Sequence, residues 1–154
     1  SSLATFRVSD ACNLDFQDRC FTVVWNQCSL EHDERWIDEL DRVLQPRGRM
    51  ALTFQTAPDQ RNPEDPFGRW TLDDLENILK GIGYSIIDKT DITPRDIESG
   101  WMMLIKKLED NRDCYVSIFG DEWIENARAD FECSAEDMRK RKCGNGRIVP
   151  QKNA

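Results

Sequence analysis

Two apolar runs of strand length, separated by a helix-like segment, set the strongest limit on how this chain folds. The runs cover residues 21–27 and 49–54. Between them, apolar residues recur at helical spacing up to Leu44, and Pro46 then prevents the helix from continuing. Parallel strands are joined by such crossovers, and continuous apolar strands are typical of sheets buried on both faces. The sequence therefore predicts a βαβ unit within an α/β sheet covered by helices on both faces.

Signals for strands, loops and helices continue on both sides of this unit. Before it, residues 4–8 predict a short strand. After it, residues 55–68 are rich in Pro, Asp and Asn, which favours a loop over the carboxyl edge of the sheet. That loop is either a lid over a substrate or a plain connection. Thr71–Asp74 is a capping box that opens the next helix, and a strand over residues 84–90 follows.

The last third of the chain is predicted to be helical before it returns to the sheet. Residues 101–138 contain two amphipathic helices divided by Gly120, and the glycines of segment 144–146 end the second helix. A final strand is predicted at residues 147–151. Because Pro150 has no N–H to donate, we expect this strand either to end before the proline or to meet a bulge there.

Composition excludes several classes of protein. The net charge of −8 argues against a nucleic-acid partner, since binding phosphates requires an excess of Lys and Arg. No segment has the length and apolarity of a transmembrane helix, and the first residues lack the pattern of a signal peptide. The six cysteines include no Cys-x-x-Cys pair, so we expect no metal site. We expect these cysteines to be reduced thiols in an intracellular, reducing compartment.

Four segments, taken in order, resemble a known family. They are residues 10–16 (DACNLDF), residues 21–27 (FTVVWNQ), Glu31-His32, and residues 42–48 (RVLQPRG). Together they are similar to the C-terminal half of a class I, Rossmann-like, S-adenosylmethionine-dependent methyltransferase of the small-molecule type. The resemblance implies a partial methyltransferase core over 1–93, a helical insertion or cap over 94–145, and the last core strand over 146–154.

The resemblance also assigns residues to the cofactor, S-adenosylmethionine. Asp10 would accept a hydrogen bond from the adenine amino group, and the residues after it would address the adenine ring with their backbone. The residues that end the strand at 21–27 would pass beneath the methionine part. The implied cofactor-binding residues are Asp10, Ala11, Cys12, Trp25, Asn26 and Gln27. The alternatives are a turn aspartate for Asp10, a small buried residue for Cys12 and core packing for Trp25.

Two further assignments concern the methyl acceptor. His32, the only histidine in the chain, would border the substrate pocket as a catalytic base; otherwise it simply precedes the cap of the next helix. In small-molecule members of the family an insertion before the last strand roofs the substrate. The implied substrate-binding residues are Trp101, Tyr115 and Trp123. The alternative is that the two helices merely pack on the sheet.

Other features depart from the family. The chain shows no Gly-x-Gly-x-Gly turn after a first strand, where the family's backbone approaches the cofactor, and no acidic residue after a second strand to bind the ribose hydroxyls. Thr22 stands where Asp is usual, and Arg47 replaces the first of two glycines. Two functions remain open: part of a methyltransferase acting on an amine, phenol or ring carbon, or a non-catalytic methyltransferase-like subunit of a larger assembly. In either case we expect a partner chain or a further chain segment to pair with the strand at 21–27, because long apolar edges attract other strands.

Overall fold

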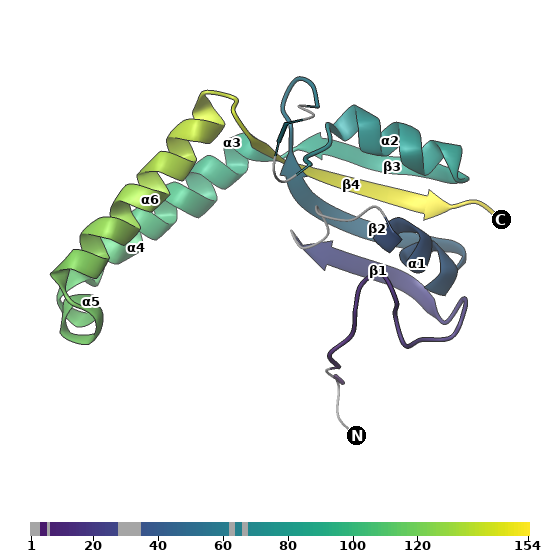
Figure 1. The fold of residues 1–154 in the computed structure, drawn as a ribbon, viewed down its shortest axis with the longest axis horizontal. Helices are drawn as coiled ribbons and strands as arrows, with labels where there is room; N and C mark the ends of the chain where they lie inside the picture. The colour runs from purple at the N-terminus through teal and green to yellow at the C-terminus, as the bar shows by residue number, and fades with distance from the viewer. Residues whose placement is uncertain (1–3, 6, 28–34, 62–63, 66–67) are drawn as a thin grey trace.

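The computed structural model describes residues 4–5, 7–27, 35–61, 64–65 and 68–154. Among these residues, four strands form one open sheet in the order β1-β2-β4-β3 (Figure 1). The strands are β1 (Phe21–Gln27), β2 (Leu44–Thr56), β3 (Tyr84–Asp91) and β4 (Gly144–Lys152). Strands β1 and β2 are parallel, whereas β4 lies antiparallel between β2 and β3. The predicted α/β class and βαβ unit are confirmed, with the last strand of the chain inserted into the middle of the sheet.

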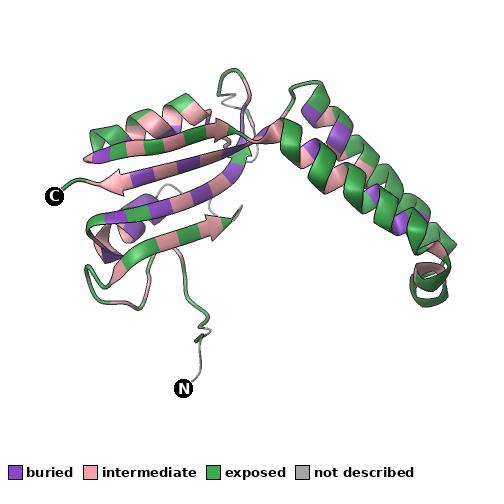
Figure 2. Ribbon diagram, turned by 180° about the vertical axis from the view of Figure 1, so that it is seen from behind, coloured by how far each residue is buried: buried purple, intermediate pink, exposed green. Residues whose placement is uncertain are grey.

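Helices α1 (Arg35–Val43) and α2 (Leu72–Gly81) pack into one core with the sheet. The predicted capping box is present at α2, where Thr71 Oγ1 accepts from the Asp74 amide at 3.0 Å and the Asp74 carboxylate accepts from the Thr71 amide at 3.1 Å. Alternate residues of β2 and β4 are buried, which aims one face of each strand at the helices (Figure 2). The buried cluster comprises Trp36, Ile37, Leu40, Leu44, Met50, Leu52, Phe54, Trp70, Leu75, Leu79, Tyr84 and Ile148.

On β1, the face of the sheet opposite the core is open, contrary to the predicted burial of both faces. Val24 is half-buried against the core cluster, whereas Val23 and Trp25 point the other way and are 59% and 73% exposed. β1 is also an edge strand among the described residues, with β2 as its neighbour. The predicted strand at 4–8 is wrong for residues 4–5 and 7–8, which form no strand and pair with no part of the sheet.

Pro150 lies inside the central strand β4 and is buried. Opposite it, the pairing register of β3 shifts between Ile86 and Asp88, so that Ile86 pairs with Pro150 and Asp88 with Val149. The predicted alternative of a bulge is therefore confirmed, although the extra residue lies on β3 rather than on β4. The bulge accommodates a residue that has no N–H for the ladder.

The helical insertion projects from the sheet as an arm, which we define as residues 93–139 (Figure 1). Its first side is α3 (Thr93–Asp96), a π-helical turn, η1 (Ile97–Trp101), and α4 (Met102–Asp110). The second side is α6 (Asp121–Arg139), and α5 (Arg112–Phe119) forms the tip. Gly120, with a φ of 86°, separates α5 from α6 as expected. Gly144 and Gly146, predicted to end the last helix, instead begin β4.

Arg47, which stands where the resembled family has the first of two glycines, adopts a left-handed conformation with a φ of 63°. Left-handed backbone costs a residue with a Cβ roughly 1–2 kcal/mol, and glycine avoids this cost but loses more entropy on folding. We expect Arg47→Gly to raise the free energy of unfolding by roughly 0.5–1 kcal/mol in urea denaturation. Arg49→Gly, in the same strand, should lower the stability instead. Destabilisation by both variants would contradict the argument.

Candidate functional site

Asp10 lies in a tight turn that its own carboxylate closes. Its Oδ1 accepts from the Cys12 amide at 2.9 Å, and its carbonyl accepts from the Asn13 amide at 3.0 Å. The Asp10 side chain is exposed, whereas Ala11 and Cys12 are half-buried and pack against the core cluster. The geometry of a turn aspartate is therefore present. The second carboxylate oxygen takes no part in that bond, and such an oxygen is an acceptor.

The residues that end β1 point to different sides of the sheet. Asn26 is half-buried, and its carbonyl accepts from Thr53 Oγ1 at 3.5 Å, while Trp25 and Gln27 are exposed. Asn26 also lines a cavity of about 20 Å³ beside Trp36 and Trp70. The indole N–H groups of these two tryptophans are buried, and neither has a hydrogen-bond partner in the part of the chain that the structure describes. The cavity has room for a single water molecule, which two such donors would hold.

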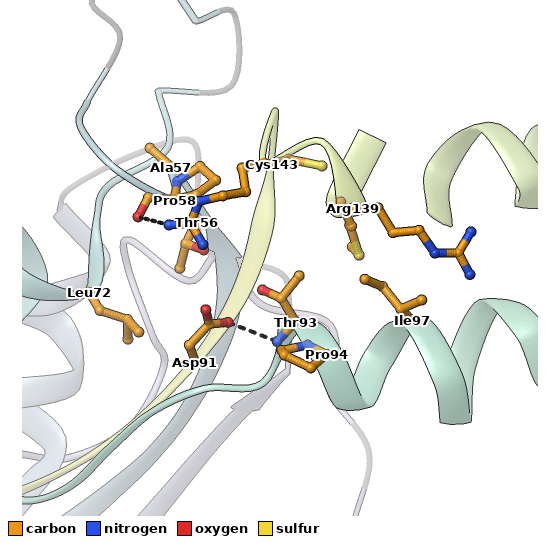
Figure 3. A pocket seen from close by; sticks show the side chains of 12 residues that line it. Thr56, Ala57, Pro58, Leu72, Asp91, Thr93, Pro94, Ile97, Arg139 and Cys143 are labelled. Carbon is orange, nitrogen blue, oxygen red and sulfur yellow. Dashed lines mark hydrogen bonds between the residues drawn. The ribbon is translucent and has the colours of Figure 1, made fainter. Parts of the chain in front are cut away.

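A larger cavity of about 300 Å³ lies where the arm joins the sheet (Figure 3). Thr56 and Asp91, which end β2 and β3, lie on its sheet side, and Thr93 begins the arm beside them. Ile97 and Arg139 line the arm side. The remaining lining residues are Ala57, Pro58, Leu72, Pro94, Met138, Arg141 and Cys143. Because carboxyl ends of parallel strands gather reactive groups in α/β sheets, this position is where a ligand site is expected.

The first residues of β4 lie tightly against the sheet side of this cavity. A Cβ at Gly144 would lie 2.7 Å from Thr93 Oγ1 and 2.9 Å from Thr56 Oγ1. A Cβ at Gly146 would lie 2.7 Å from Leu72 Cδ2. Both glycines thus let the backbone of β4 approach residues that line the cavity. The sequence contained this signal as Gly-Asn-Gly, but the pattern was assigned to a helix end, so the cavity was not predicted.

Charged groups around the cavity are held by defined partners. Asp91 Oδ1 accepts from the Thr93 amide at 2.9 Å, which anchors the start of the arm. Arg141 donates to Asp59 Oδ1 at 2.6 Å, and this bond lowers the pKa of the Asp59 carboxyl. Burial raises the pKa of the Cys143 thiol. The lining thus combines apolar residues and two hydroxyls with the charged Asp91, Arg139 and Arg141, which suits a polar organic molecule. A neutral thiol is a poor nucleophile, so this environment does not favour catalysis by Cys143.

The three aromatic residues assigned to the substrate are spread along the arm and do not line this cavity. Trp101 is half-buried against Phe131, with ring centroids 6.0 Å apart. Tyr115 is half-buried in α5, and Trp123 is 45% exposed beside Phe119, 4.6 Å between centroids. Trp101 thus packs between two helices of the arm, and the arm projects from the sheet rather than packing on it as the simpler alternative required. The substrate roles of all three residues stay predictions.

The remaining expectations concern residues outside the described ranges, metal ions and membrane-spanning helices. His32, the predicted catalytic base, lies outside the described residues, as does Cys28. Within the described ranges, no three His, Cys, Asp or Glu residues gather in a way that would hold a metal ion. None of the described helices is both long enough and apolar enough to cross a bilayer.

Comparison with known proteins gives one family match. Residues 1–52, which include the Asp10 turn and the β1–α1 unit, match the methyltransferase domain family. A curated relative is the chloroplastic tocopherol O-methyltransferase of Arabidopsis thaliana, 31% identical over 80 residues. That alignment covers 50% of this chain and 23% of the relative, so the chain spans only part of the protein it matches.

Two solved structures show the same fold over nearly the whole chain. Phosphoethanolamine N-methyltransferase 2 of Haemonchus contortus, in complex with phosphomonomethylethanolamine and S-adenosylhomocysteine, has a TM-score of 0.83 at 17% identity. A putative sarcosine dimethylglycine methyltransferase of Galdieria sulphuraria has a TM-score of 0.78 at 20% identity. Each match covers 94% of this chain, but 36% and 58% of the respective solved chains. Residues 1–52 are therefore similar to the methyltransferase domain family, and the chain has the Rossmann-like fold of these solved methyltransferase structures.

Proposed function

We propose that this chain is part of an S-adenosylmethionine-dependent methyltransferase that transfers a methyl group to a small molecule. The observation that carries the proposal is the family match over residues 1–52, because the methyltransferase domain family uses this cofactor. The matched range contains the Asp10 turn and reaches into β2. A solved relative of the same fold binds S-adenosylhomocysteine, the product of methyl transfer.

In this proposal the turn at Asp10 receives the adenine, and the end of β1 lies beneath the methionine part. The exposed Asp10 carboxylate would accept from the exocyclic amine, which is only a donor. The exposed indole of Trp25 offers an aromatic face, the surface that attracts a sulfonium cation. The 154 residues contain no Gly-x-Gly-x-Gly turn, the element whose backbone approaches the cofactor closely in the resembled family.

The methyl acceptor would bind at the carboxyl edge of the sheet, and the cavity at the arm base is a candidate for part of its site. Its apolar residues, Leu72, Ile97 and Met138, would contact a ring or short chain. Asp91 and Thr93 would contact a polar group of the acceptor. His32 would take the proton that the acceptor loses, if the acceptor is an amine or a phenol.

A non-catalytic role as a methyltransferase-like subunit is the second candidate. It is favoured by Thr22, which stands where the resembled family has Asp, and by the left-handed Arg47, which occupies a position where that family has glycine. To separate the two, we would isolate the native protein that contains this sequence and titrate it with S-adenosylmethionine in a calorimeter. Binding followed by release of S-adenosylhomocysteine with an acceptor supports the enzyme. A native protein that does not bind the cofactor would exclude it.

The open edge and open face of β1 lead us to propose that another strand covers them in the native particle. We expect the isolated 154-residue chain to self-associate in light scattering, since exposed apolar edge strands pair with other chains. Val23→Lys combined with Trp25→Lys should reduce the association, because both side chains are exposed on β1. Ile118→Lys, at a 64% exposed position of the arm tip, should leave it unchanged. A monodisperse wild-type monomer would refute the proposal.

A further inference from the structure

One side chain of α1 binds the segment that joins the Asp10 turn to β1. The Arg42 guanidinium donates to the Leu14 carbonyl at 2.9 Å and to the Phe16 carbonyl at 2.8 Å. It also donates to Asp18 Oδ1 at 2.8 Å. The Arg42 carbonyl accepts from the Arg19 amide at 2.9 Å. Arg42 therefore contacts four positions of a segment that lies 23 to 28 residues before it in the sequence.

Glu39, one helical turn earlier, completes the arrangement. Its Oε1 accepts from Arg42 Nε at 2.9 Å, and its Oε2 accepts from Arg42 Nη2 at 2.8 Å. The same Oε2 accepts from the Leu14 amide at 2.8 Å. The pair thus engages both backbone groups of Leu14, the amide through Glu39 and the carbonyl through Arg42. We call Glu39 and Arg42 the α1 clamp.

The segment under the α1 clamp has little else to order its backbone. Residues 14–20 form neither helix nor strand, so no ladder of hydrogen bonds holds them. Ala11, Cys12 and Leu14 pack against the core cluster at its rim, which gives side-chain contact but little directional restraint. Bidentate, charge-assisted hydrogen bonds from arginine supply that direction. The side chains of Arg42 and Glu39 are 31% and 18% exposed, so water competes only in part for these bonds.

We propose that Glu39 and Arg42 are positioning residues that hold the Asp10–Cys12 turn, and with it the adenine end of the cofactor site, on α1. This inference rests on the proposed function, because that function assigns the Asp10–Cys12 turn to the adenine of the cofactor. The contacts themselves show that the α1 clamp holds residues 14–19, the segment that joins this turn to β1. It also ties the adenine end of the site to the helix that follows β1.

Both side chains of the α1 clamp are charged in the form that makes these hydrogen bonds, so the bonds do not depend on pH near neutrality. Hydrogen bonds from Arg42 and from the Leu14 amide lower the pKa of Glu39 to about 2. Hydrogen bonds to Glu39 and Asp18 raise the pKa of Arg42 above its ordinary value. Both residues are therefore ionised at neutral pH. Lysine at position 42 would keep the charge but could not reproduce the forked geometry that reaches two carbonyls.

The test uses the thiol of Cys12 as a reporter of the turn. We would alkylate the native protein that contains this sequence briefly with iodoacetamide and measure labelling at each cysteine by peptide mass spectrometry. Arg42→Ala should accelerate labelling of half-buried Cys12 at least about tenfold, the ratio for one lost charge-assisted hydrogen bond. Arg42→Lys should give a smaller increase, and Arg128→Ala, an exposed ion-paired arginine of α6, should give none.

The other cysteines separate local from global opening. Cys114, exposed in α5, should label at the same rate in every variant, and half-buried Cys143 should stay slow. Equal Cys12 rates in wild type and Arg42→Ala would overturn the proposal, as would a rise at Cys143 that equals the rise at Cys12. If Arg42→Ala does not fold, the same comparison is made with Arg42→Lys.

Failure of this inference differs from failure of the proposed function. The labelling experiment contains no cofactor, so it tests the α1 clamp alone. Titration of the native protein with S-adenosylhomocysteine tests cofactor binding. If Arg42→Ala accelerates Cys12 labelling as expected but the native protein does not bind S-adenosylhomocysteine, the proposed methyltransferase function is wrong and the α1 clamp stands. If the native protein binds S-adenosylhomocysteine but Cys12 labelling is unchanged, the α1 clamp is wrong and the proposed function stands.

Discussion

Gly48→Ala is expected to destabilise the fold by roughly 1–3 kcal/mol, the usual cost of forcing an extra methyl group into a packed site. A Cβ at Gly48 would lie 2.7 Å from Leu44 Cγ and 2.8 Å from the Gln45 carbonyl oxygen. The Gln45 oxygen belongs to the backbone of the same strand, so it cannot move aside without disturbing β2. Leu44 is fully buried in the core, which leaves its side chain little room to shift.

Urea denaturation followed by circular dichroism measures this effect. Gly81→Ala is the matched control, because a Cβ at Gly81, in the last turn of α2, meets no atom within 4 Å. We expect that substitution to be close to neutral or slightly stabilising, since alanine favours helix. Similar stability changes in the two variants would mean that close packing at Gly48 has no special role.

Asp10→Ala is expected to weaken cofactor binding in the native protein by roughly 1–3 kcal/mol, the cost of leaving a hydrogen-bond donor of the ligand unpaired. The structure adds a second reason for the loss, because the Asp10 carboxylate also accepts from the Cys12 amide and closes the turn. Calorimetric titration with S-adenosylhomocysteine measures the change. An affinity that equals that of the wild type would exclude Asp10 from the site.

Two further variants separate the causes. Asp10→Asn keeps one acceptor oxygen for the Cys12 amide, whereas its NH2 group cannot accept from the adenine amine. Any affinity that it retains beyond Asp10→Ala therefore reports the closed turn rather than the adenine contact. His32→Ala should leave cofactor affinity unchanged and lower the rate of methyl transfer. If methyl transfer survives both Asp10→Ala and His32→Ala, the assignment of the site to these residues is wrong.

The local elements were predictable because their signals are short-range. Pro46 follows the end of α1, the Thr71 capping box opens α2, and Gly120 divides two helices of the arm, each through the backbone geometry of a few neighbouring residues. The order of these elements, with the family motifs at Asp10 and Trp25, was enough to identify the methyltransferase fold. Because Pro150 has no N–H, the sequence left two alternatives for the last strand: the strand ends before the proline, or a bulge lies there.

The site depended on contacts that no local signal reveals. The cavity at the arm base exists because Gly144 and Gly146 start a strand that runs between β2 and β3, beside Thr56 and Thr93. In the sequence the same glycines were compatible with a helix end. Likewise, the left-handed turn at Arg47 was not predicted, because an arginine carries no preference for that conformation.

The sequence by itself determined which segments become helices and strands, and which family they resemble, since spacing and turn residues act within a few positions of the chain. Only the tertiary structure decided what those segments face. It left Trp25 exposed on an uncovered face of the sheet, and it brought Arg42 to the backbone of Leu14 and Phe16. Contacts across 26 to 28 residues depend on how the whole chain packs, and for that reason the α1 clamp became visible only in the folded molecule.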